Sequence, residues 1–227
     1  MEDYALQYGE GDSSLMSKVL FKFSISLLLM TVGMVVGALF IPPALASMMP
    51  ILCLGMLLIA FFARWMQSRR TGEAAAGLSM GFVYVFAALE GVGLYPIVMY
   101  YTQTIGANLV LGAGAVTFVL FFGLAIYARK TSRNFLAIGP MLFFGLIALI
   151  LASIVGLFVQ ATMLQIAICA GGVFIFSGYV LYDIQTMRTG LMTEDDVPML
   201  VLSLFLDFIN LFIYILRLFG FAAAGRD

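Results

Sequence analysis

Histidine is absent from this chain, and charged side chains of either sign are scarce. Only 10% of the 227 residues are Asp, Glu, Lys or Arg, and the formal net charge is −1. A chain with this charge has no basic face for nucleic acid, which excludes nucleic acid as a partner. Because His is the side chain that usually titrates near neutral pH, a response in that range must come from carboxyl groups in unusual surroundings.

Cysteine is also rare. Cys53 and Cys169 are the two thiols, each lies in an apolar run, and neither has the spacing of a metal or redox motif. We expect both to behave as small buried apolar side chains. The sequence therefore predicts no resident cofactor.

Apolar residues make up the rest of the chain. They account for 63% of the sequence, and the mean hydropathy is +1.11, more than the core of a soluble domain requires. The apolar runs are about 20 residues long, which is the length of a helix that crosses a bilayer. Short segments of alternating polarity, typical of a membrane β-barrel, are missing. These features predict an all-α integral membrane protein.

Seven helices and two short tails follow from the apolar runs and the residues that interrupt them. The predicted helices cover residues 19–40, 45–65, 76–101, 107–128, 137–159, 162–187 and 197–219. They form a transmembrane domain over 19–220, between a polar tail at 1–18 and a short tail at 221–227. The first tail lacks a basic start and a cleavage site, so we expect it to be retained. Thr193 and Asp196 are spaced like a capping box ahead of the last helix.

Basic residues predict the orientation. With the N-terminus in the cytoplasm, the loops after the second, fourth and sixth helices are cytoplasmic too, and the opposite loops contain no Lys or Arg. Nine of the eleven basic residues then obey the positive-inside rule, with Arg217 and Arg226 as exceptions. A re-entrant last helix would satisfy all eleven. The short tail and compact loops favour the inner membrane of a bacterium.

Two carboxylates lie inside apolar helices, Asp183 in the sixth and Asp207 in the seventh. Ionisable groups at membrane depth are costly and usually functional. Counted from Arg188, Asp183 lies about 7 Å into the membrane, and counted from Pro198, Asp207 lies about 13 Å in. The difference of roughly 6 Å is within side-chain reach. We therefore predict that the two carboxyl groups of these antiparallel helices meet.

A contact between two carboxyl groups has chemical consequences. The pair can share one proton and titrate as a unit, so a change in protonation could open or close a gap between the helices. Carboxylate oxygens are also ligands for Ca²⁺, so Asp183 and Asp207 are candidate calcium ligands. Arg64, at the end of the second helix, is the best-placed cation to pair with them.

Other polar residues lie at membrane depth. The seventh helix carries a stripe with spacings of 4, 3, 4 and 3, formed by Ser203, Asp207, Asn210, Tyr214 and Arg217. Such a stripe faces a cavity or joins helices through hydrogen bonds. Glu90, in the third helix, either lines a pathway or donates to a backbone carbonyl while protonated. Glu90, Ser203, Asn210 and Tyr214 are therefore candidate pathway residues.

Sequence motifs identify a family. The segments FSGYVLYDIQTM and LSLFLDFINLFIYILRLFG resemble the two aspartate motifs of the Bax inhibitor-1 (transmembrane BAX inhibitor motif) family, above all its bacterial YetJ-like calcium-leak members. AFFARW, GFVYVFAALEGVGLYPIV and MTEDDVPML extend the resemblance over essentially the whole chain. The resemblance implies seven helices with the last one central and wrapped by the other six. It also implies a pH-sensitive calcium leak governed by Asp183 and Asp207, with Arg64 as their hydrogen-bond partner.

One position departs from the pattern of these relatives. They carry a glutamate eleven residues before the arginine, where this chain has Cys53. Glu90 stands where those relatives have a small polar residue. We expect the ion path or its gating to differ here, with Glu90 as a candidate replacement for the missing acid.

Three functional hypotheses are consistent with these sequence features. The first is a calcium leak channel gated by the aspartate pair, with Ca²⁺ as the transported ion. The second is a non-conducting regulator of a membrane-bound protease or of cell-death signalling, which would require a membrane-protein partner. The third is an intramembrane aspartyl protease, which also has a Tyr-Asp in its sixth helix. That enzyme needs Gly-x-Gly where this chain has Leu204-Phe205-Leu206, so we predict that the protein is not an enzyme.

Overall fold

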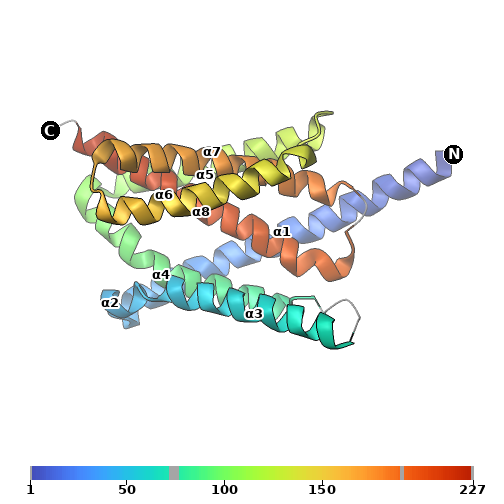
Figure 1. Ribbon diagram of the computed structural model, residues 1–227, viewed down its shortest axis with the longest axis horizontal. Coiled ribbons are helices and arrows are strands. Elements are labelled where there is room, and N and C mark those ends of the chain that lie inside the picture. Colours follow the sequence, from blue (N-terminus) through green and yellow to red (C-terminus); the bar gives the residue numbers. More distant parts are fainter. Residues whose placement is uncertain (1, 72–76, 190–191, 226–227) are drawn as a thin grey trace. The chain divides into compact units, whose positions relative to one another are not determined.

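The computed structural model describes residues 2–71, 77–189 and 192–225, and they are almost entirely helical (Figure 1). Seven helices in this part of the chain are long and apolar enough to cross a membrane, which confirms the predicted class. The elements are α1 (Glu2–Phe40), α2 (Pro43–Ala46), α3 (Met49–Thr71), α4 (Met80–Ile105), α5 (Ala107–Lys130), η1 (Leu136–Ile138), α6 (Gly139–Phe158), α7 (Thr162–Met187), η2 (Glu194–Asp196) and α8 (Val197–Ala224).

The bounds of α5, α6 and α7 agree with the sequence prediction to within two residues. α8 instead continues to Ala224, past the predicted end at 219 and into the segment predicted as a tail at 221–227. The second predicted helix, 45–65, is divided into the short turn α2 and the longer α3. Pro43 and Pro50 explain this division, because proline is tolerated in the first turn of a helix but not in its interior. Thr193 and Asp196 form the predicted capping box, in which Asp196 Oδ2 accepts a hydrogen bond of 2.9 Å from the Thr193 N–H.

The segment predicted as a polar tail at 1–18 is helical from Glu2 onward. It contains no proline, and Gly9 and Gly11 are tolerated in a helix at a cost of about 1 kcal/mol each. The polar composition of this segment therefore did not end the helix. Arg226, and the side chains of Arg69 and Arg70, lie outside the described residues.

The chain forms two compact units, and each is described by itself. Unit 1 contains Met1–Met99 and Met192–Phe205, and unit 2 contains Tyr100–Leu191 and Leu206–Asp227. α4 and α8 each contribute residues to both units. α8 belongs to the most buried of the candidate spans. In an 18-residue stretch of that span, 56% of the residues are buried, against 44% for α4 and less for the others. The arrangement of the other six helices around it stays a prediction.

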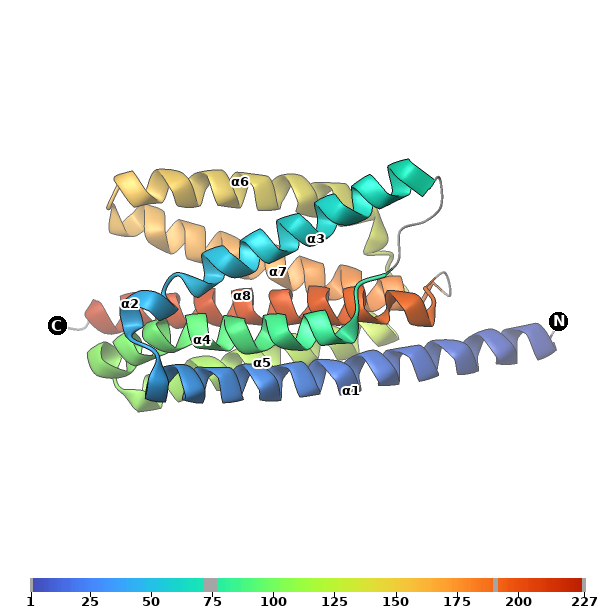
Figure 2. The ribbon, with the colours of Figure 1, turned by 90° about the horizontal axis from the view of Figure 1, so that it is seen from below.

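In unit 1, α1 and α4 pack with their backbones in close contact (Figure 2). A Cβ atom on Gly33 would lie 2.0 Å from the carbonyl oxygen of Ala88, and one on Gly91 would lie 2.0 Å from that of Met30. Small residues allow this approach in membrane helices, where van der Waals packing rather than water expulsion drives association.

Contacts at the ends of unit 1 agree with the predicted alternation of its loops. Lys18 forms an ion pair with Glu194, and Gly77 lies against the carbonyl of Asp195. The start of the first span, the loop before α4 and the hairpin before α8 therefore share one end. Both partners of the ion pair are exposed, so it contributes little stability but does mark this common end.

In unit 2, α6 and α7 lie side by side (Figures 1 and 2). A Cβ atom on Gly178 would lie 2.5 Å from a methyl carbon of Leu142, so these helices also use glycine for close packing. α8 is uninterrupted over 28 residues, long enough to cross a bilayer. A re-entrant helix would have to turn back, so this continuity argues against a re-entrant last segment.

We predict that Gly33→Ala and Gly91→Ala each lower the free energy of unfolding by about 1–3 kcal/mol, since the added methyl group meets a backbone oxygen that cannot rotate away. The midpoint of thermal unfolding in detergent can be followed by the reactivity of the buried thiols Cys53 and Cys169. Gly55→Ala is the matched control, because its Cβ meets nothing within 4 Å. Equal midpoints for Gly91→Ala and Gly55→Ala would contradict the packing argument.

Candidate functional site

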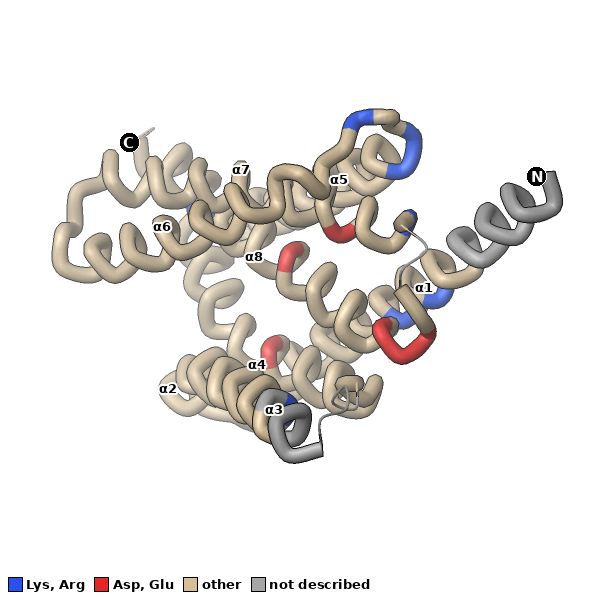
Figure 3. Tube along the Cα trace, turned by 45° about the vertical axis from the view of Figure 1, so that its right-hand side comes forward, with Lys and Arg blue, Asp and Glu red and all other residues tan. Residues whose placement is uncertain are grey.

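The structure brings Asp183 and Asp207 together within unit 2. Asp183 is 7% exposed in α7 and Asp207 is 4% exposed in α8, and their side chains are close enough for a hydrogen bond. Each is the single acidic residue of its helix, visible as an isolated red segment in Figure 3. The estimate of depth from the helix ends therefore predicted this contact.

A hydrogen bond between two carboxyl groups requires that one of them carries a proton, because an ionised carboxylate can only accept. The pair then holds one negative charge in place of two, which is the cheaper state at membrane depth. Oδ2 of Asp207 is buried and has no hydrogen-bond partner among the described residues. A buried oxygen of this kind is an acceptor for a second proton or a cation.

Aromatic side chains lie near the pair. Tyr179, one turn before Asp183 in α7, lies close enough to both carboxyl groups to interact with their charges. Phe121 of α5 packs edge-to-face on Phe208, the residue after Asp207, with ring centroids 5.4 Å apart. The electrostatic interaction between the two acids is therefore weakly screened.

Calcium binding at this pair would be incomplete without further ligands. The described residues contain no group of three or more Asp, Glu, His or Cys side chains that could hold a metal ion. Since Ca²⁺ takes six to eight oxygen atoms, Asp183 and Asp207 would need backbone, hydroxyl or water oxygens to complete a shell.

Two side chains near the end of α7 hold Asp183 in register. Gln185 Oε1 accepts a hydrogen bond of 2.6 Å from the Phe135 N–H, and its Nε2 donates one of 2.6 Å to the Arg133 carbonyl. Arg188 donates to the carbonyl of Ala128 at 2.8 Å. The sequence marks Arg188 only as a basic residue at the helix end and gives no role to Gln185. A buried amide two positions from an intramembrane aspartate was the available signal.

The polar stripe of α8 does not form one continuous lining. Asn210 donates a hydrogen bond of 2.7 Å back to the carbonyl of Leu206 in its own helix. Tyr214 packs on Phe176, with ring centroids 6.0 Å apart, and against the backbone of Gly172. Ser203 belongs to unit 1. The role of these residues along a pathway stays a prediction.

Glu90 lies in contact with Cys53 in unit 1. The thiol of Cys53 in α3 and the carboxyl group of Glu90 in α4 form a hydrogen bond, and Cys53 is fully buried, as predicted. A carboxyl group from a neighbouring helix therefore lies beside the buried thiol at position 53. Arg64 is half-buried in α3, also in unit 1, and its contact with the aspartate pair stays a prediction.

Seven membrane-length helices and a contact between two buried carboxyl groups define a polytopic membrane protein with an intramembrane acid pair. Residues 12–224 match the family described as "Inhibitor of apoptosis-promoting Bax1". The chain therefore belongs to the Bax inhibitor-1 family.

Bacterial relatives are similar over much of the chain. An uncharacterized protein of Helicobacter pylori strain J99 is 33% identical over 148 residues, which are 65% of this chain and 64% of that protein. One of Borreliella burgdorferi is 33% identical over 175 residues, 74% of each chain. An uncharacterized membrane protein of Streptococcus pyogenes serotype M3 is 35% identical over 142 residues, 60% of each. The match to the Helicobacter protein thus spans slightly less than two thirds of its length.

We predict that Gln185→Met lowers the free energy of unfolding by about 1–3 kcal/mol, because it removes two hydrogen bonds and leaves the Phe135 N–H without its acceptor. Thermal unfolding in detergent measures the change. Gln160→Met is the control, since Gln160 is exposed in the loop between α6 and α7. If the two variants unfold at the same temperature, Gln185 does not anchor this end of α7.

Proposed function

We propose that this protein is a pH-sensitive calcium leak channel in which the Asp183–Asp207 pair is both the proton sensor and part of the gate. The observation that carries the proposal is the contact between two buried carboxyl groups on α7 and α8. Family membership supports it, because the family match covers residues 12–224 and so includes both aspartates.

The physical basis of gating is the number of protons that the pair holds. With one shared proton, the hydrogen bond joins α7 to α8. A change of one proton either adds a second negative charge, with strong repulsion at low dielectric, or neutralises both groups and weakens the bond. Either change alters the force between two helices, so the conformational equilibrium of the pair depends on pH.

Calcium is the cargo in this proposal and not a resident cofactor. Asp183 and Asp207 offer carboxylate oxygens at membrane depth, including the unpaired Oδ2 of Asp207. Two carboxylates hold Ca²⁺ weakly, and weak binding permits release on the far side.

We place the protein in the inner membrane of a bacterium, with the N-terminus in the cytoplasm. The positive-inside pattern supports this orientation, and the contacts of Lys18 with Glu194 and of Gly77 with Asp195 support the alternation of loops on which it rests.

We expect Ca²⁺ flux into dye-loaded proteoliposomes to change between about pH 5 and pH 8, and Asp183→Asn or Asp207→Asn to flatten this dependence, since asparagine cannot exchange the proton. Asp195→Asn is the matched control, because Asp195 is exposed in the hairpin before α8. If the folded protein shows no Ca²⁺ flux at any pH, the leak is excluded. That result would favour a non-conducting regulator with a membrane-protein partner, a role that the family description also suggests.

The Glu90–Cys53 contact predicts an exchange of acids. We expect Glu90→Gln to reduce Ca²⁺ flux to near background, and Cys53→Glu in that variant to restore it, because a carboxyl group at either position occupies the same region of unit 1. Cys53→Ser in the Glu90→Gln variant is the control, since it introduces a polar group without a charge. Full flux in Glu90→Gln alone would show that this acid is not part of the path.

A further inference from the structure

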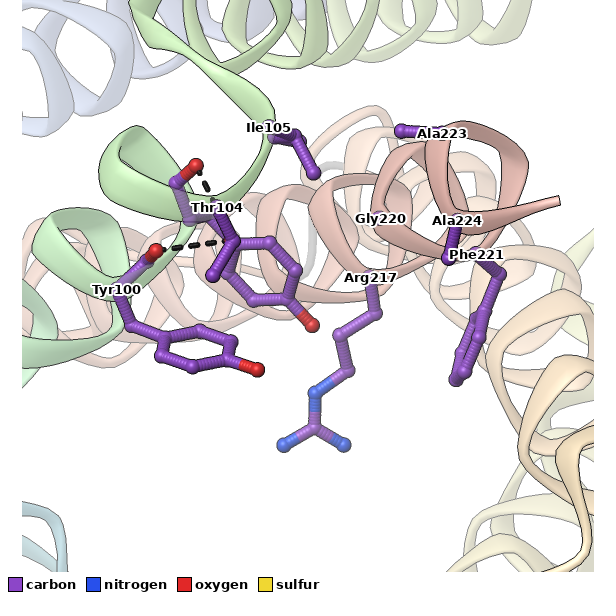
Figure 4. A pocket seen from close by; sticks show the side chains of 9 residues that line it. Tyr100, Thr104, Ile105, Arg217, Gly220, Phe221, Ala223 and Ala224 are labelled. Atoms are coloured by element: carbon purple, nitrogen blue, oxygen red, sulfur yellow. Dashed lines mark hydrogen bonds between the residues drawn. The ribbon is translucent and has the colours of Figure 1, made fainter. Parts of the chain in front are cut away.

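A pocket of about 310 Å³ lies at the end of unit 2 where α4 and α8 finish. One wall is polar and is formed by Tyr100, Tyr101, Thr104 and Arg217, while Ile105, Phe221 and the last alanines of α8 form an apolar wall (Figure 4). Gly220 permits this arrangement. A Cβ atom there would lie 2.5 Å from the ring of Tyr101, so glycine lets that ring pack against α8.

Arg217 has no anionic partner within the described residues, where Lys18 and Glu194 form the salt bridge that is present. Its side chain is half-buried. Figure 4 shows the guanidinium group pointing into the same open space as the hydroxyl group of Tyr100. Because a guanidinium group carries five N–H donors and stays charged at every physiological pH, a half-buried one requires an acceptor.

The tyrosines add donors to the same space. Tyr100 and Tyr101 pack edge-to-face, with ring centroids 5.3 Å apart, and Tyr101 is close enough to Arg217 to interact with its charge. The hydroxyl group of Thr104 is already engaged, since it donates to the carbonyl of Tyr100 at 2.9 Å. The free donors in the pocket are therefore a guanidinium group and phenols, a combination that suits an oxyanion.

The position of the pocket along the helices indicates which class of oxyanion it binds. Arg217 lies seven residues before the end of α8, about 10 Å along the helix axis. Tyrosine and arginine at this distance from a helix end lie at the level of the lipid head groups. An apolar wall beside the donors provides a surface for the glycerol and upper acyl chain of a lipid.

We propose that this pocket binds the phosphate group of a phospholipid, with Arg217 as the charged donor and Tyr100 and Tyr101 as hydroxyl donors. This site is separate from the aspartate pair and does not depend on the proposed leak. It also accounts for Arg217 as an exception to the positive-inside rule, because a phosphate ligand neutralises a basic residue on the side where such residues are rare.

Charge compensation at helix ends is the competing explanation for Arg217. Cations stabilise the C-terminal ends of helices, and α4 and α8 both end here. That effect alone requires neither an open space beside the guanidinium group nor phenols directed into it. The two explanations differ in whether a lipid binds.

The test is titration of the full-length protein in detergent with phosphatidylglycerol, followed by native mass spectrometry and by the midpoint of thermal unfolding. We expect a bound lipid and a raised midpoint for the wild type, and about tenfold weaker binding for Arg217→Gln, as for loss of a hydrogen bond to a charged group. Arg129→Gln, which removes one exposed arginine from the end of α5, is the control and should bind as the wild type does.

Two further measurements distinguish binding of the phosphate group from binding of the acyl chains and from binding of free phosphate. Diacylglycerol has the acyl chains without the phosphate and should not bind, while an excess of inorganic phosphate should not displace the lipid. Binding of diacylglycerol, displacement by inorganic phosphate or unchanged affinity in Arg217→Gln would each overturn the proposal. If Arg217→Gln fails to fold, Tyr101→Phe tests the same site by removing one hydroxyl group, and unchanged affinity there counts equally against it.

Discussion

A carboxyl group inside a membrane needs a partner, and unit 2 meets this constraint by giving Asp183 and Asp207 to each other. Two separate negative charges would be costly at that depth. The contact exists only if α7 has the correct rotation and height, so it depends on features distant from the acids. Gln185 fixes the end of α7 to the loop after α5, and Arg188 fixes it to the last turns of α5. Gly178 sets the distance of α7 from α6.

The parts of the structure that the sequence predicted follow from short-range physics. Apolar length and a rise of 1.5 Å per residue locate the spans and also the depth of Asp183 and Asp207, because both quantities are counted along one helix. The capping box of Thr193 and Asp196 was predictable for the same reason, since its partners are three residues apart.

The parts that could not be predicted depend on partners far away in the chain. Gln185 forms hydrogen bonds with backbone atoms about 50 residues earlier. Cys53 of α3 contacts Glu90 of α4. The spacing of residues along one helix does not predict such pairs, because they form only when helices pack. The start of α1 at Glu2 shows a different limit. A polar segment without proline can remain helical, so polarity alone did not predict where α1 begins.

The cost of burying a charge is met in different ways at the aspartate pair and at Arg217, both in unit 2. The hydrogen bond between the aspartates requires a proton, which lowers the charge of the pair from two negative charges to one. Arg217 cannot be neutralised in that way, because a guanidinium group does not lose its proton and no acid in the described residues pairs with it. Its charge must therefore be met from outside the chain. At the level of the lipid head groups the abundant anion is phosphate, so the arginine that violates the charge rule stands where the bilayer itself can compensate for it.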